Sequence, residues 1–414
     1  MADYVEVHCD HNGPEFAADP AGTLNVLRDK APLVYSTAYG GFWMALDYEL
    51  VAAASRDHTT FSTSREVHGK NALSMIIPLE WETEPLTPIE LDPPLHTPYR
   101  RMLMSVLSKT AIERDLRPKL EAITDYCIDR FIRTGRGDLV NDVSGPVPTI
   151  LTLSWLGMPT QHWPRVAKIQ HNIVGYHPTS PEFGEAIADL AWQNDLITQT
   201  ITQKRIEPAD DVITFLTRQE IDGQQLSDKT IHEMVTLIIA GGVDTTTALM
   251  GQAFSYLEGR PELHRQFLSD PEFRETAIDE FLRYYTPNTA HARTVTCPVE
   301  FGGQQLKRGD RVLLCWLGAN HDPKVFESAD ELVLDRTSNK HAAFGLSVHR
   351  CAGANLARLE IDVMLSKVLE RLPDYRIDRD KAHLYPSQGG TSGWSLMPVS
   401  FPPGESIGDG DLPS

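Results

Sequence analysis

The chain has 414 residues, of which 41% are hydrophobic and 23% are charged, as is ordinary for a soluble globular protein. Its net charge of −19 argues against a general nucleic-acid-binding protein, because attraction to phosphates needs a basic face. The five cysteines lie far apart and form no Cys-x-x-Cys pair, so neither a zinc ribbon nor a dithiol redox pair is expected.

The N-terminus shows no basic stretch followed by an apolar run, so we expect no signal peptide. The longest apolar stretches, such as residues 234–243, are too short to cross a bilayer. We therefore expect a cytoplasmic, monomeric protein that binds neither membranes nor nucleic acid.

The first predicted elements are two strands in residues 33–46, which flank a Gly-Gly turn. Residues 78–94 carry five prolines and predict an irregular connection. From about residue 96 to residue 285 the pattern is mainly helical, with breaks expected near four prolines: Pro159, Pro164, Pro178 and Pro208.

Residues 293–316 predict further strands, whereas residues 319–350 have little periodicity and predict a long ordered loop. A loop of this length inside a compact domain is usually functional. Residues 352–372 predict a helix that ends at Pro373. Since the chain shows no repeat and no clear linker, we expect one domain over residues 1–401, followed by a disordered tail over residues 402–414.

The long buried helix expected over residues 227–257 is interrupted by unusual residues. Each glycine in a helix interior costs about 1 kcal/mol relative to alanine, and a buried aspartate loses its hydration. Close packing of a neighbouring helix would explain Gly241 and Gly242, but not Asp244 and Thr245. The Thr245 hydroxyl can bond back to the Gly241 carbonyl and open the helix, which predicts a groove that binds a small ligand and passes protons to it.

One cysteine lies in a loop of small residues, where the last long helix begins. Cys351 follows His349 and precedes Gly353 in the stretch AFGLSVHRCAGANLARLE. A helix N-terminus lowers the pKa of a thiol, and only the thiolate acts as a nucleophile or metal ligand. Three interpretations stay open: a small buried side chain, a nucleophile with His349 as its base, and an axial ligand of a metal or haem.

Several charged pairs lie far from this loop in the sequence. Glu280 and Arg283 lie one helical turn apart, where most such pairs are exposed and contribute roughly 0.2–0.5 kcal/mol. The other groups are cationic or hydrogen-bonding and together suit an anionic cofactor with two carboxylates: His96, Arg100, His291, Arg293 and His349.

This combination of motifs resembles the cytochrome P450 family of haem-thiolate monooxygenases. The family's cysteine loop reads Phe-Gly-x-Gly-x-His-x-Cys-x-Gly, and the chain carries in register Phe344, Gly345, His349, Cys351 and Gly353. It departs from the pattern at Ser347, where the family usually has glycine. The motifs follow the family's order from residue 96 to residue 353, and the resemblance covers nearly the whole chain.

The resemblance implies a role for each motif. Cys351 would be the axial ligand of the iron of haem b (iron protoporphyrin IX), and Asp244 and Thr245 would deliver protons to O₂. The propionate contacts map onto His96, Arg100, Arg293 and His349. Fold and haem-loop scaffolding would come from Glu280, Arg283 and Arg336.

The resemblance also implies a fold and a reaction. The fold would be one mainly α domain with a smaller β-rich part. The reaction would insert one oxygen atom from O₂ into a hydrophobic small molecule. Because the chain shows no flavin or iron–sulfur motif, electrons from NAD(P)H would arrive through a ferredoxin reductase and a ferredoxin.

Two other classes stay open. A thiolate-haem sensor or binding protein would not need Asp244 and Thr245, and a cysteine hydrolase would not need the basic set.

An acidic ferredoxin would need a local basic patch on this acidic chain, for which the candidates are Arg101, Lys340 and Arg350.

The candidate substrate pocket is mostly apolar, which predicts a terpenoid, a steroid or an aromatic compound as substrate. Its walls are predicted to be Ile77, Leu79, Trp81, Leu86, Leu237, Ala240, Asn288, Thr289, Trp394 and Leu396. The sequence does not identify the compound or the carbon that is attacked.

Overall fold

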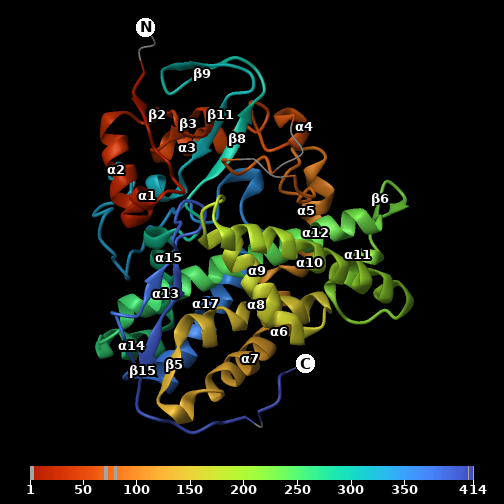
Figure 1. The fold of residues 1–414 in the computed structure, drawn as a ribbon, viewed down its shortest axis with the longest axis vertical. Coiled ribbons are helices and arrows are strands. Elements are labelled where there is room, and N and C mark those ends of the chain that lie inside the picture. Colours follow the sequence, from red (N-terminus) through yellow and green to blue (C-terminus); the bar gives the residue numbers. More distant parts are fainter. Residues whose placement is uncertain (1–3, 70–72, 79–81, 409, 414) are drawn as a thin grey trace.

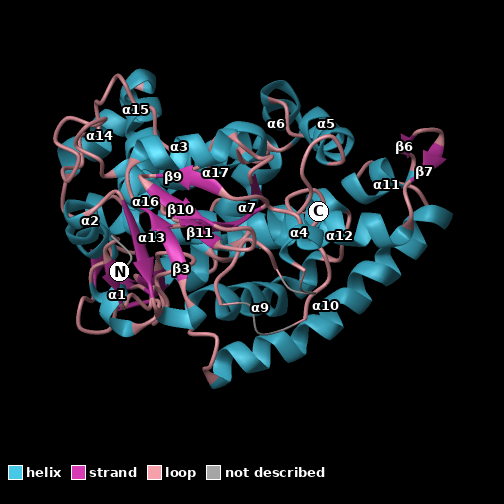
Figure 2. Ribbon diagram, turned by 90° about the horizontal axis from the view of Figure 1, so that it is seen from above, coloured by secondary structure: helices cyan, strands magenta, loops and turns pink. Residues whose placement is uncertain are grey.

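Helices make up most of the molecule, and a twisted sheet covers one end of it (Figures 1 and 2). The computed structural model describes residues 4–69, 73–78, 82–408 and 410–413. The long helices α10 and α12 run across the middle of the molecule, and the sheet lies beyond them on the side of the N-terminus. This arrangement confirms the predicted mainly α architecture with a smaller β-rich part.

The helices alternate with loops along the whole chain. Their bounds are α1 (Pro14–Ala18), α2 (Pro20–Lys30), α3 (Tyr48–Arg56), α4 (Arg65–His68), α5 (His96–Val106), α6 (Lys109–Asp115), α7 (Arg117–Asp129), α8 (Pro146–Leu156), α9 (Trp163–Gly175), α10 (Pro181–Ile206), α11 (Val212–Thr217), α12 (Asp228–Gly242), α13 (Asp244–Leu257), α14 (Pro261–Ser269), α15 (Pro271–Tyr285), α16 (Trp316–Asn320) and α17 (Ala354–Arg371). The helix breaks expected near the four prolines are confirmed. Pro164 lies in the first turn of α9, where the backbone N–H has no partner within the helix, so a proline is tolerated there.

The main sheet has six strands in the order β1 (Glu6–Val7), β2 (Leu33–Ser36), β3 (Phe42–Ala45), β11 (Arg311–Leu314), β8 (His291–Val295) and β4 (Phe61–Ser62). The smaller sheets pair β9 (Val299–Phe301) with β10 (Gln304–Leu306), β13 (His383–Leu384) with β14 (Trp394–Leu396), β6 (Glu220–Ile221) with β7 (Gln224–Gln225), and β15 (Pro398–Ser400) with both β12 (Arg376–Ile377) and β5 (Arg136–Asp138). The antiparallel pair β2–β3 confirms the predicted N-terminal hairpin. In the centre of the sheet, Arg293 on β8 lies opposite Val312 on β11.

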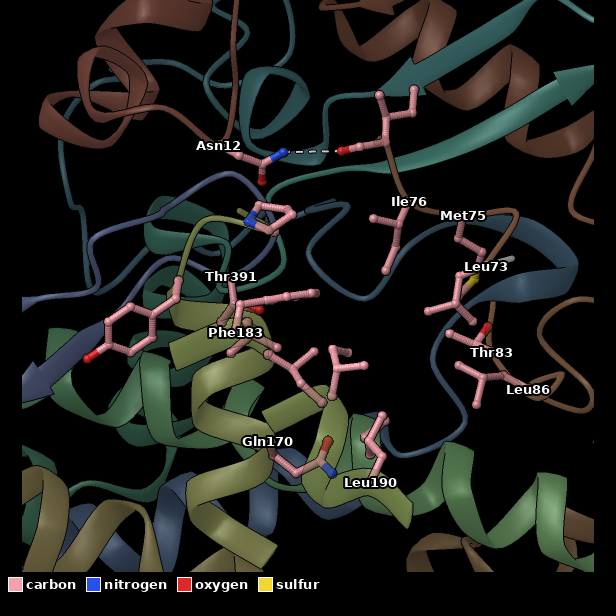
Figure 3. Close-up of a pocket in the computed structure, with 18 of the residues that line it drawn as sticks. Asn12, Leu73, Met75, Ile76, Thr83, Leu86, Gln170, Phe183, Leu190 and Thr391 are labelled. Atoms are coloured by element: carbon pink, nitrogen blue, oxygen red, sulfur yellow. Dashed lines mark hydrogen bonds between the residues drawn. The ribbon is translucent and has the colours of Figure 1, made fainter. Parts of the chain in front are cut away.

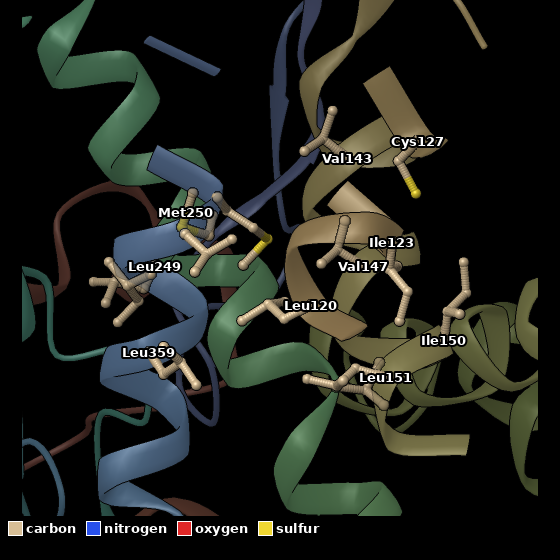
Figure 4. Close-up of a cluster of buried hydrophobic side chains, with 14 of the residues drawn as sticks. Leu120, Ile123, Cys127, Val143, Val147, Ile150, Leu151, Leu249, Met250 and Leu359 are labelled. Carbon is tan, nitrogen blue, oxygen red and sulfur yellow. The ribbon is translucent and has the colours of Figure 1, made fainter. Parts of the chain in front are cut away.

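The main hydrophobic core lies among α7, α8, α13 and α17 (Figure 4). Leu120 of α7, Ile150 of α8, Met250 of α13 and Leu359 of α17 are all buried there. Apolar side chains recur at helical spacing on each of these helices, and burying that stripe stabilises the packing. The core therefore holds α13 and α17 against each other, and these helices carry the two motifs singled out in the sequence.

The helix predicted over residues 227–257 is present but divided. Ser227 caps α12 by accepting the Thr230 N–H at 3.1 Å, as expected of an N-cap. The break falls at Val243, between α12 and α13. Within the described residues, this α12–α13 segment alone is long and apolar enough to cross a membrane by length and composition, and 61% of its most apolar window is buried inside the protein.

The segment between α16 and α17 confirms the predicted long loop, since its one helical turn is a short 3₁₀ segment, Ser347–His349.

Near the C-terminus, the backbone N–H groups of Ile407 and Gly408 donate to the Asp129 carboxylate of α7. The domain boundary after residue 401 stays a prediction.

Candidate functional site

The loop before α17 presents a cysteine in a folded turn. The Cys351 N–H donates to the Phe344 carbonyl at 2.7 Å, and the Arg350 N–H donates to the Ser347 carbonyl at 3.1 Å. These bonds close the chain on itself just before the helix begins. The thiol therefore sits on a short, internally bonded loop rather than on a free segment.

Two residues of this loop adopt the left-handed backbone conformation: Gly345 with φ +67° and Ser347 with φ +61°. That region is open to glycine, whereas an L residue pays about 1–2 kcal/mol there. Ser347 is the position where the chain departs from the glycine of the family pattern. The backbone thus takes a glycine-type turn with a serine in it.

The Cys351 side chain is exposed, although protein groups surround it. Desolvation by the surrounding protein groups raises the pKa of the Cys351 thiol, while the Gly353 N–H and the guanidinium groups of Arg100, Arg350 and Arg358 lower it. The net shift of the pKa is upward. Coordination to a bound metal cation would favour the thiolate, because it deprotonates a thiol.

The other cysteines lie in different surroundings. Cys9, Cys127 and Cys315 are buried, and burial raises the pKa of Cys9 to about 11 and that of Cys127 to about 12. Cys297, in contrast, is exposed. Cys351 is thus the cysteine whose thiol faces a group of arginines.

The predicted cationic set comes together near this loop. The rings of His96 and His349 lie 4.7 Å apart, and His349 Nε2 lies 3.3 Å from the Thr63 hydroxyl. Burial, followed by the charge of Arg293 and other nearby cationic groups, lowers the pKa of His349 to about 2. His349 is therefore neutral and can only donate or accept hydrogen bonds.

The protein removes both arginines of this set from much of the solvent. Arg293 is 4% exposed, and burial lowers its pKa to about 10. Burial also lowers the pKa of the half-buried Arg100. Within the described part of the chain, no carboxylate forms an ion pair with either guanidinium. Because burying an unpaired charge is costly, this cluster fits a ligand that brings two carboxylates of its own, as haem does.

The acid and the alcohol of the divided helix lie at its break. Asp244 is 2% exposed, and its Oδ2 atom has no hydrogen-bond partner among the described residues. Thr245 Oγ1 donates to the Gly241 carbonyl at 3.0 Å, which confirms the predicted back-bond. Gly241 is exposed, and a Cβ built on it would meet no atom within 4 Å. The helix therefore opens onto free space beside Thr245.

Glu280 and Arg283 form a fully buried ion pair, with two N–O distances of 2.8 Å. Arg336 reaches the same carboxylate at 3.0 Å, so the three predicted scaffold residues lie together. Arg283 also donates to the carbonyls of Asn320, Ala329 and Glu331 at 2.7–2.8 Å. This network ties α15 to the long loop that leads to Cys351.

A cavity of about 570 Å³ lies between the sheet and the helices (Figure 3). Leu73 and Met75 approach it from just before the proline-rich segment, and Leu86 approaches it from within that segment. Phe183 and Leu190 approach it from α10. Four predicted pocket residues line it: Ile77, Leu86, Ala240 and Asn288. Leu79 and Trp81 lie outside the described residues.

Four other predicted pocket residues are not among those that line the cavity: Leu237, Thr289, Trp394 and Leu396. Trp394 packs against Gly251 and donates from its ring N–H to Gln252 at 3.1 Å. The sequence analysis missed the walls from α9 and α10, including Gln170 and Phe183. An amphipathic helix pattern shows that one face is buried, but not whether that face meets a core or a cavity.

Comparison with known proteins gives the family. The family model described as Cytochrome P450 matches residues 266–373. The chain is 30% identical to a steroid C26-monooxygenase of Mycolicibacterium smegmatis, over 76% of this chain and 79% of the relative. It is 32% identical to cytochrome P450 107B1 of Saccharopolyspora erythraea, over 70% of each chain. A solved structure of a mutant of P450 EryK in complex with erythromycin B superposes with a TM-score of 0.82 and 26% identity, covering 96% of this chain and 99% of that one.

The chain therefore belongs to the cytochrome P450 family, and the predicted fold and family are confirmed. It is a haem-thiolate monooxygenase, an oxidoreductase that uses haem and O₂. Relatives named as monooxygenases give no support to a haem sensor or a cysteine hydrolase.

Proposed function

We propose that Cys351 is the axial ligand of the haem iron and that His96, Arg100, Arg293 and His349 bind the haem propionates. The observation that carries this assignment is two largely desolvated arginines that form no ion pair with a carboxylate of the described residues, one of which, Arg100, lies near the exposed Cys351 thiol. When bound there, the haem would supply O₂ binding and its activation by two electrons. The arginines would neutralise the propionates, and His349 would donate a hydrogen bond to one of them.

The assignment of Cys351 is tested by replacing single cysteines. Cys351→Ser should abolish the strongly red-shifted Soret band of the reduced CO complex, because an alcohol does not replace the thiolate. The matched control is Cys297→Ser, which changes the other exposed cysteine and should keep the band. A Cys351→Ser variant that retained the red-shifted band would overturn the assignment.

Asp244 and Thr245 are the proposed proton-delivery pair. Asp244 is buried, and one of its oxygen atoms has no partner in the described part of the chain, so that oxygen is available to pass on a proton. The Thr245 hydroxyl, which the Gly241 carbonyl holds in place, would keep a water molecule at the opened helix. Glu280, Arg283 and Arg336 would hold the loop of the cysteine and take no part in the chemistry.

We further propose an uncharged, mostly apolar substrate with a few hydrogen-bonding groups. Among the described residues, the cavity wall carries no lysine or arginine, and its two carboxylates, Glu82 and Glu84, belong to exposed side chains. Burial lowers the pKa of His11 to about 4 and that of His291 to about 3, so both are neutral. The wall thus offers apolar surface and amide or hydroxyl groups, but no partner for an anion.

The substrate class is tested by the change in haem spin state on binding. A neutral sterol should bind with a dissociation constant at least about tenfold lower than a long-chain carboxylate of similar length, since a buried unpaired anion is costly. A steroid and a macrolide-sized compound are the first choices, given the names of the relatives. Tighter binding of the carboxylate would contradict the proposal.

Electrons are proposed to come from NAD(P)H through a ferredoxin reductase and a ferredoxin. The bacterial relatives support a cytoplasmic enzyme, and we propose that it acts as a monomer.

A further inference from the structure

Two side chains from distant parts of the chain meet at the Asp244 carboxylate. The Tyr385 hydroxyl donates to Asp244 Oδ1 at 3.3 Å, and His171 Nδ1 lies 3.5 Å from the same oxygen. His171 Nδ1 and the Tyr385 hydroxyl are 3.2 Å apart, and the two rings meet edge to face with their centroids 4.7 Å apart. His171 comes from α9, and Tyr385 directly follows β13.

The fold makes room for Tyr385 with two glycines. A Cβ on Gly175 would lie 2.9 Å from the tyrosine Cδ1 atom, and a Cβ on Gly393 would lie 3.1 Å from its Cε2 atom. The backbone N–H of Tyr385 donates to the Gly393 carbonyl at 2.9 Å. The ring is therefore held between two close stretches of backbone, with its hydroxyl directed at Asp244.

The raised pKa of Tyr385 indicates which group donates and which accepts in each hydrogen bond of this contact. Burial and the neighbouring Asp244 raise the pKa of Tyr385 well above its usual value, so the tyrosine keeps its proton and donates it to the carboxylate. Its oxygen can then only accept a hydrogen bond from His171, which places the imidazole proton on Nδ1. The His171 Nδ1–H group thus points toward both the tyrosine oxygen and the carboxylate.

His171 is also the member of this group that reaches solvent. Its side chain is 21% exposed, whereas that of Asp244 is 3% exposed and Tyr385 is buried. In the part of the chain that the structure describes, Asp244 is the one carboxylate that forms an ion pair with His171. The nearby Lys168 of α9 lies 4.0 Å from Glu185 of α10, and both of those side chains are mostly exposed. The histidine therefore connects water outside to the buried acid inside.

We propose that His171 is a positioning residue that carries protons from solvent to Asp244, with the Tyr385 hydroxyl aligning the transfer. This inference rests on the proposed role of Asp244 in proton delivery. A hydrated proton binds Nε2 of His171 while the proton on Nδ1 passes to Asp244 Oδ1, directly or through the tyrosine hydroxyl, which takes one proton and gives one. Asp244 then releases a proton on the side of Thr245 and returns to the carboxylate, and exchange with water returns the histidine proton to Nδ1. The protons are consumed when the second oxygen atom of O₂ leaves as water.

The first experiment follows how electrons are used. His171→Gln keeps an N–H donor but cannot bind and release a proton at this site. We expect it to lower the rate of product formation about tenfold, less than the ~10²–10⁴-fold typical of a general acid, because Asp244 itself remains. The fraction of NAD(P)H recovered as hydrogen peroxide should rise several-fold, and the ratio of rates in H₂O and D₂O should increase. The matched control is His383→Gln, an exposed histidine on β13, which should behave as the unchanged protein.

The second experiment measures the hydrogen bond itself, independently of turnover. In the diamagnetic ferrous CO complex with ¹⁵N-labelled histidine, the ring signals that disappear in His171→Gln belong to His171. At a pH where the ring is neutral we expect the proton on Nδ1. In the double variant Asp244→Asn with Tyr385→Phe it should be shared between both nitrogens. A neutral His171 that carries its proton on Nε2 alone in the unchanged protein would overturn the proposal.

The outcomes separate this inference from the proposed function. If Asp244→Asn releases more peroxide while His171→Gln does not, the role of Asp244 stands and that of His171 is refuted. If Asp244→Asn leaves product and peroxide unchanged, both proposals fail. If both variants release more peroxide, substrate binding measured by the haem spin state decides between two explanations. Normal binding in each variant supports the relay, whereas weakened binding indicates a distorted pocket and refutes the relay.

Discussion

At the scale of single residues, Ser347 shows how a side chain can conflict with the turn that it occupies. Its φ of +61° lies in the region that glycine adopts freely, and the cysteine loop depends on this turn. An L residue loses about 1–2 kcal/mol there, while glycine loses about 0.5–1 kcal/mol more conformational entropy on folding. Serine at this position therefore leaves the loop slightly destabilised.

We predict that Ser347→Gly stabilises the haem-loaded protein by about 0.5–1 kcal/mol, the difference between these two effects. Reversible denaturant unfolding would measure the change in the free energy of unfolding. Ser347→Ala is the control, since it removes the hydroxyl but keeps the Cβ that causes the strain. Equal stabilisation by alanine and glycine would show that the backbone is not the cause.

Asp244 is a second single residue whose position is energetically costly. The sequence marks it as an acid in an apolar helix, and the structure shows that it is buried with one oxygen that has no partner among the described residues. A buried polar atom without a partner costs roughly 1–3 kcal/mol. Such a group is typical of a functional site rather than of a scaffold.

At the scale of elements, the division of one helix into α12 and α13 creates the opening beside Thr245, where we propose that protons are delivered. The break at Val243, together with the Thr245 bond to the Gly241 carbonyl, keeps the two halves apart. The core formed with α7, α8 and α17 holds α13 in place, so the opening does not depend on a flexible segment.

We predict that the Thr245→Ala variant binds haem normally but diverts electrons from product formation to hydrogen peroxide. Without the hydroxyl, water at the opened helix loses its fixed partner, and product formation should fall by about tenfold or more while peroxide release rises. Product and hydrogen peroxide per NAD(P)H consumed are the quantities to measure. Thr245→Ser retains the hydroxyl and should stay close to the unchanged enzyme. Full coupling in Thr245→Ala would contradict the proposed role.

The long loop between α16 and α17 is a second element whose order has an identifiable cause. The buried Glu280–Arg283 pair lies on α15, and Arg283 and Arg336 bond to several carbonyls of the loop. Removing one member of a buried pair costs about 3–5 kcal/mol because it leaves an unpaired charge. The loop is therefore ordered by a charge network rather than by secondary structure.

At the scale of the whole molecule, the net charge of −19 opposes docking of an acidic electron carrier. The structure leaves Arg101, Lys340 and Arg350 exposed, and Arg350 and Lys340 flank the cysteine loop. A docking surface that carried these cations would raise the association rate and make it depend on salt.

We predict that Arg101→Glu combined with Arg350→Glu slows ferredoxin-driven turnover about tenfold at low salt and less at high salt, because salt screens the interaction. Turnover against ferredoxin concentration at two ionic strengths would measure this. Substrate binding and the CO band should not change. Lys30→Glu is the control with a similar charge change, since α2 lies across the molecule from α5 (Figure 1). An unchanged dependence on ferredoxin in the double variant would place the docking surface elsewhere.

Most of the element order could be predicted from the sequence because the signals are local. The N-cap of α12, the Gly-Gly hairpin, the proline-rich connection and the Thr245 back-bond all depend on residues within a few positions of each other. The same holds for the cysteine loop and for the spacing of Glu280 and Arg283. These patterns were sufficient to indicate the family and its fold.

The tertiary structure alone decided which distant residues meet. Tyr385 lies 141 residues beyond Asp244 in the chain, and no pattern around either residue indicates their contact. Likewise, residue type did not show what a side chain contacts. Trp394, predicted to line the pocket, packs on Gly251, whereas Phe183, which was not predicted there, lines the cavity. The physical reason is that periodicity shows which face of an element avoids water, while the packing of all elements determines what that face meets.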